Sequence, residues 1–168
     1  INSAGATTID LSNMASAGTA TLFSVSADSL TMTLGAGSGT VSAGLLSIVD
    51  SAVANSHLTV DGASFKGQLN LANVSASGNA TISLGGDGGI SASEIQAGGA
   101  LTLDNSTSTS GRVVIGNASA SGALTINLGN ATGTSAFNFS ALNTGANLTI
   151  DASNVASDFD MEDISASG

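Results

Sequence analysis

A threonine that recurs at a nearly constant step is the feature that most constrains the fold of this chain. Each copy is followed by an aliphatic residue and then by a small polar or acidic one. The seven copies lie 21 to 28 residues apart, at Thr8, Thr31, Thr59, Thr81, Thr102, Thr125 and Thr149. A Thr-x-Asp form alternates with a form that ends in Leu-Gly, so the full unit is two steps long. Self-similarity at such a period is typical of solenoids, in which each repeat packs on its neighbours.

The apolar pattern inside each repeat predicts strands. Leu58 and Val60 alternate with Thr59 and Asp61, which is the period of a strand with one buried face. A second strand follows in alternate coils, with inward pairs at Leu69 and Leu71, Val113 and Ile115, and Phe159 and Met161. Three residues later come the residues expected to turn a corner into the core, Val74, Ala118 and Ile164. Tracts rich in Gly, Asn and Ser supply the other corners.

These patterns predict an all-β fold, a single parallel β-solenoid (β-helix) of about seven coils over residues 1–168. Each coil has 21–28 residues, and the usual chirality of parallel crossovers favours a right-handed coil. One buried ladder is expected to contain Ile9, Met32, Val60, Ile82, Leu103, Ile126 and Ile150. An antiparallel sandwich also has short, regularly spaced strands, but it does not need the same residue at the same place in every turn. A helical fold is disfavoured because Gly and β-branched residues dominate.

No capping repeat is recognisable at either end of the sequence. Solenoids usually carry caps, because an open coil presents unpaired strand edges. The chain is therefore expected to be part of a longer array, or to stack on other molecules through its ends.

Charge restricts the partners of the protein. The net charge is −10, with twelve acids against Lys66 and Arg112 alone. Nucleic acids and anionic membrane surfaces are disfavoured as partners, because both require a basic surface, whereas cations are favoured. No apolar run reaches the 18 residues that would indicate membrane insertion.

Catalysis is disfavoured by the residues that are present. The one histidine is His57, Lys66 and Arg112 lie in different coils, and no GxSxG motif occurs. We therefore expect no catalytic residue and no organic cofactor. A polysaccharide-processing β-helix enzyme remains an alternative, although aromatic residues make up only 3% of the chain.

Two groups of acids are candidate calcium ligands, because calcium prefers several oxygen ligands. The first occupies one repeat position, with one carboxylate in every second coil, at Asp10, Asp61, Asp104 and Asp151. The second is an acidic tail of Asp158, Asp160, Glu162 and Asp163. The competing interpretation of the first group is that each Asp begins a turn. The GGDGG segment at 85–89 is interpreted as a glycine-rich corner rather than a calcium motif.

Segments such as LTIDASNV and ALTINLGNATGTS, in a chain without Cys, resemble the repeat regions of bacterial surface-layer proteins and large secreted adhesins. The nonapeptide array of the RTX proteins is missing. The resemblance implies a secreted, cell-surface structural protein that self-associates into a filament or lattice, with calcium as a candidate cofactor and cell-surface polysaccharide as a candidate partner. The threonine ladder leaves an ice-binding solenoid as an alternative, although only Thr31 and Thr33 form a Thr-x-Thr pair.

Overall fold

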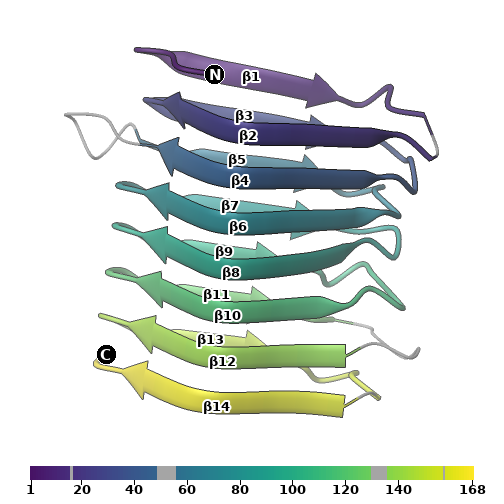
Figure 1. The fold of residues 1–168 in the computed structure, drawn as a ribbon. Coiled ribbons are helices and arrows are strands. Elements are labelled where there is room, and N and C mark those ends of the chain that lie inside the picture. The colour runs from purple at the N-terminus through teal and green to yellow at the C-terminus, as the bar shows by residue number, and fades with distance from the viewer. Residues whose placement is uncertain (16, 49–55, 130–135, 157) are drawn as a thin grey trace.

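The computed structural model describes residues 1–15, 17–48, 56–129, 136–156 and 158–168, and these residues form fourteen strands in two parallel sheets (Figure 1). The first sheet contains the short strands β1 (Ala6–Leu11), β3 (Ser29–Leu34), β5 (Leu58–Gly62), β7 (Ala80–Leu84), β9 (Leu101–Asp104), β11 (Leu124–Asn127) and β13 (Leu148–Asp151). The second contains β2 (Thr19–Ala27), β4 (Thr40–Ile48), β6 (Gln68–Ala76), β8 (Gly89–Ala97), β10 (Val113–Ala120), β12 (Ala136–Thr144) and β14 (Asp158–Ala166).

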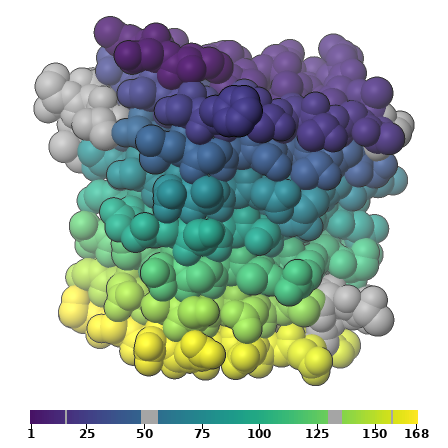
Figure 2. Space-filling model, in the orientation of Figure 1, coloured from purple at the N-terminus to yellow at the C-terminus, as the bar shows by residue number. Residues whose placement is uncertain are grey.

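Every coil contributes one strand to each sheet, and the strands follow chain order from one end to the other. The result is a β-solenoid of about six turns, close to the predicted seven coils, because seven strands per sheet are separated by six turns. Figure 2 shows the coils as successive layers from the N-terminal to the C-terminal end. The parallel solenoid is confirmed, and the antiparallel sandwich is wrong.

The predicted repeat register is confirmed strand by strand. Thr8 pairs with Thr31, and the pairing continues from coil to coil through to Thr149. The predicted apolar ladder from Ile9 to Ile150 is in the same register one residue later. Its five inner members are buried, whereas Ile9 and Ile150 are half-buried because each lies in an end coil.

The long strands bend in the middle. In β6, Leu69, Leu71 and Val74 point inward, and the consecutive residues Ala72 and Asn73 both point outward. Two successive outward residues interrupt the alternation, so the strand turns a corner. The predicted inward pairs and corner residues are therefore confirmed, within one continuous strand per coil. Ile164 occupies the same corner position in the last coil and is 48% exposed there.

Candidate functional site

The aspartates of alternate coils cap turns. Each carboxylate Oδ1 accepts a hydrogen bond from the backbone N–H two residues later, at Asp10–Ser12 (2.8 Å), Asp61–Ala63 (3.2 Å), Asp104–Ser106 (3.0 Å) and Asp151–Ser153 (3.1 Å). This is the local bond by which Asp initiates a turn. The Ser12 side chain and then its N–H lower the pKa of Asp10, and Ser153 acts on Asp151 in the same way.

The capping aspartates are separated from one another by uncharged residues. Thr33, Ser83 and Asn127 occupy the intervening coils, so successive carboxylates lie two coils, or roughly 10 Å, apart. Among the described residues no group of three or more His, Cys, Asp or Glu side chains is placed to hold a metal ion.

The acidic tail lies along β14, in the last coil. All four of its carboxylates are exposed, and Asp160 accepts a long hydrogen bond (3.4 Å) from Asn138 Nδ2 in the preceding coil. Asp158 and Asp160 share one face of the strand, as expected from their spacing, and Glu162 and Asp163 occupy the two consecutive outward positions of the bend. The four are therefore spread along one strand rather than pointing at one centre.

Asp87 has a role that the sequence did not reveal. It lies in the GGDGG corner between β7 and β8, where Gly86 and Asp87 both adopt left-handed backbone conformations, with φ of 57° and 71°. Its Oδ1 accepts three hydrogen bonds from the next coil, from Thr109 Oγ1 (2.7 Å), Thr109 N–H (2.9 Å) and Ser110 N–H (3.1 Å). The carboxylate therefore joins two successive corners. The glycine-rich corner was predicted correctly. The bond from Thr109 to Asp87 was not predicted, because no sequence motif links these two residues, which lie 22 positions apart.

The Asp87 bonds predict a specific acid sensitivity. The Thr109 hydroxyl first, and then the Thr109 N–H, hold the pKa of Asp87 below its usual value of about 3.8. Because the folded-state pKa is lowered, the stabilisation is complete above about pH 4 and is lost as the pH falls through the folded-state pKa. We expect chemical denaturation between pH 5 and 2 to show a smaller loss of stability in an Asp87→Asn variant than in the parent.

Thr109→Val is the matched variant for the acid-sensitivity test, since it removes the hydroxyl donor and leaves the carboxylate in place. It should also reduce the acid-dependent loss. If the free energy of unfolding falls equally with pH in the parent and in both variants, then protonation of Asp87 does not affect stability.

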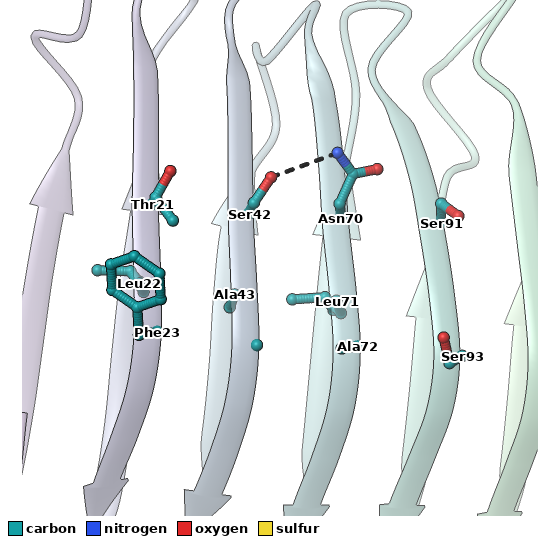
Figure 3. A pocket seen from close by; sticks show the side chains of 11 residues that line it. Thr21, Leu22, Phe23, Ser42, Ala43, Asn70, Leu71, Ala72, Ser91 and Ser93 are labelled. Carbon is teal, nitrogen blue, oxygen red and sulfur yellow. Dashed lines mark hydrogen bonds between the residues drawn. The ribbon is translucent and has the colours of Figure 1, made fainter.

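A hollow of about 420 Å³ lies on the outer face of β2, β4, β6 and β8 (Figure 3), and we call it the Phe23 groove. One side is a row of uncharged polar residues, Thr21, Ser42, Asn70 and Ser91, in register from coil to coil. The other side is Phe23 followed by the small residues Gly44, Ala72 and Ser93. The backbone of Leu22, Ala43 and Leu71 forms the floor, because their side chains point into the core. Asn70 Nδ2 donates to Ser42 Oγ (3.4 Å).

A second hollow, of about 460 Å³, follows the far end of the long strands. Its wall is a row of hydroxyl and amide side chains, Ser75, Gln96, Ser119, Asn143 and Ser165. The linings of both hollows contain no Asp, Glu, His, Lys or Arg. Neither lining therefore supplies a general acid or base, and both are suited to contact rather than to proton transfer.

No protein-family model, curated protein or solved structure matches the chain. In the described part of the chain, no helix is long and apolar enough to cross a bilayer. The function is therefore argued from the solenoid, its ends and its outer faces.

Proposed function

We propose that this chain is a structural segment of an extracellular assembly, whose coils continue from one molecule to the next to build a filament or lattice. The observation that carries the proposal is the unbroken parallel register of both sheets, which allows the last coil of one copy to stack on the first coil of another. Among the described strands, β1 and β2 at one end and β13 and β14 at the other have a neighbouring strand on one side only. The Ser24–Ser26 part of β2 is additionally bonded on its outer side to residues 1–3, through a parallel bridge between Asn2 and Ser26. Open strand edges of this kind readily pair with further strands.

The end coils also expose apolar residues that the inner coils bury. The inward-facing Ile9 and Leu22 at one end, and Phe159 and Met161 at the other, are half-buried, and Ile164 is 48% exposed. Burial of these side chains against another coil is favourable by about 25 cal/mol per Å² of apolar surface.

The two ends are complementary because both sheets are parallel throughout. A C-terminal coil that stacks in register on the N-terminal coil of a second copy brings Ile150 onto Ile9 and Met161 onto Leu22. The end of its β14 then displaces residues 1–3 of the second copy, which are bonded to Ser24 and Ser26. This contact joins two different surfaces, and it therefore propagates instead of closing into a dimer. The resemblance to surface-layer and adhesin repeats supports the same extracellular, structural role.

Calcium is proposed to control this junction. Inside the chain, each capping aspartate is next to an uncharged residue in the neighbouring coils, Thr33, Ser83 or Asn127. At the junction Asp151 would instead lie beside Asp10, about one coil spacing of 4.8 Å away. Two carboxylates at that distance repel each other, and the acidic tail adds charge to the same coil. Calcium, which binds carboxylate oxygens, would remove the repulsion.

We expect the purified 168-residue chain to assemble when millimolar calcium is added and to dissociate when a chelator is added, as measured by light scattering and electron microscopy. An Asp151→Asn variant keeps an oxygen that can cap the turn but lacks the charge, so it should assemble at lower calcium. Asp61→Asn is the matched control, because it removes an internal member of the same column, and it should behave like the parent. A parent that stays monomeric at millimolar calcium and high concentration would refute the assembly proposal.

The register of the seven threonines favours ice binding as a second candidate function. One Thr per coil lies on the outer face of the short-strand sheet, in an unbroken column. The adjacent outward column contains a second threonine only at Thr33, and aspartates that cap turns occupy its alternate coils. Thermal hysteresis of the purified protein tests this candidate, and the absence of hysteresis would exclude it.

A further inference from the structure

Phe23 differs from the other described phenylalanines in the exposure of its side chain. Its side chain is 87% exposed, whereas Phe65, Phe137 and Phe139 are at most 1% exposed and Phe159 is half-buried. Figure 3 shows the ring standing on the outer face of β2, beside the hollow. An exposed aromatic ring offers a rigid apolar face on which the apolar side of a ligand can pack.

The groove beside Phe23 is kept open by the backbone packing of the next coil. A Cβ at Gly44 would lie 2.7 Å from the Phe23 carbonyl oxygen, so a side chain cannot be accommodated there without moving the backbone. Ala72 and Ser93 continue the row with small side chains. The hollow therefore extends from the Phe23 ring over four strands, a length of about three coil spacings, or ~14 Å.

The polar row defines the chemistry of a ligand. It offers one hydroxyl or amide group per coil, at Thr21, Ser42, Asn70 and Ser91, parallel to the row that begins with Phe23. A ligand that fits needs an apolar face toward the Phe23 ring, and hydroxyl groups toward the polar row. The lining has no charge and the whole chain carries −10, so an anionic ligand would be repelled without any compensating contact.

We propose that the Phe23 groove binds a neutral polysaccharide laid along the solenoid axis. The C–H face of one sugar packs on the Phe23 ring, and the hydroxyl groups of the following sugars exchange hydrogen bonds with the polar row. This site goes beyond the proposed structural role. Copies of the chain would join through their ends, whereas the polysaccharide would bind to the side of the solenoid.

A peptide fits this groove less well. The backbone groups of β4, β6 and β8 are engaged by a neighbouring strand on both sides, so the face of the sheet offers only side chains. An extended peptide laid there would lose water from its own N–H and C=O groups without gaining backbone partners, which is costly. Sugar hydroxyls can be satisfied by the side chains of the polar row.

Native affinity electrophoresis tests the proposal, with gels that contain mixed-linkage β-glucan, xylan, mannan or dextran, and alginate as an acidic comparison. The parent should be retarded by at least one neutral polysaccharide and not by alginate. Phe23→Ala should weaken the apparent affinity at least tenfold. Ala72→Leu, which fills the groove without removing a polar group, should do the same. Leu45→Ala removes an exposed apolar side chain of the same sheet outside the lining, and it should stay within twofold of the parent.

Several outcomes would overturn the proposal. They are retardation of the parent by none of the neutral polysaccharides, retardation by alginate alone, or equal retardation of the parent and Phe23→Ala. A change in the sedimentation coefficient of Ala72→Leu without polysaccharide would show that a second copy covers the groove instead. Because Ala72 lies on the internal strand β6, the Ala72→Leu variant leaves both ends unchanged. Calcium-dependent light scattering by this variant therefore reports on assembly alone, so a loss of polysaccharide binding can be distinguished from a loss of assembly.

Discussion

Replacing Ile82 by Asp is expected to unfold the central coils of the protein. Ile82 is 0% exposed and pairs with Val60 on one side and Leu103 on the other, both of which are also buried. A carboxylate at this position has no partner, so it must either be buried as a charge or be forced out with the strand. We expect a loss of more than about 4 kcal/mol, comparable to the whole stability of many domains. Urea denaturation followed by circular dichroism measures the loss.

Thr81→Asp is the control for the Ile82 variant, since it introduces the same charge one residue earlier on the outer face. Thr81 is half-buried and lies between Thr59 and Thr102, which are uncharged. This variant should cost less than about 1 kcal/mol, as is usual for surface substitutions. Similar losses in the two variants would show that the inner and outer faces of β7 are assigned incorrectly.

Replacing Asn105 by Leu is expected to raise stability. Asn105 is 2% exposed, and neither Oδ1 nor Nδ2 of its side chain has a hydrogen-bond partner. It follows β9 at the coil position that Leu84 and Leu128 occupy in the neighbouring coils, and both leucines are buried. A buried polar group without a partner costs about 1–3 kcal/mol, so an aliphatic side chain that continues the ladder should recover a similar amount. The midpoint of urea denaturation should rise with no change in its slope.

The reverse substitution, Leu84→Asn, provides the matched test of this stabilisation. It places the same amide one coil earlier in the same ladder and also removes apolar volume, so we expect a loss of about 2–5 kcal/mol. If Asn105→Leu proves less stable than the parent, then the Asn105 side chain makes a stabilising interaction within the core.

The sequence by itself determined the register of the solenoid. In a stack of parallel coils, equivalent positions lie directly above one another, so every repeat places the same requirement on the same residue. Thr59 pairs with Thr81, and Val60 with Ile82, as the spacing predicted. The alternation inside one repeat assigned the inner and outer faces for the same reason. The aspartates at the ends of the short strands were predicted either to initiate turns or to bind calcium. The bonds at Asp10 and Asp61 show that these residues cap turns, and calcium binding stays a prediction.

Only the tertiary structure decided which side chains meet across coils outside the repeat register. The GGDGG segment that contains Asp87 occurs once in the sequence, so no periodicity pointed to the contact between Asp87 and Thr109. The continuous bend of the long strands was likewise decided in three dimensions, and so was the groove between Phe23 and the polar row, because a hollow depends on the size of neighbours from several coils at once. A repeat pattern reports what every coil shares, whereas a binding surface is made by the residues in which the coils differ.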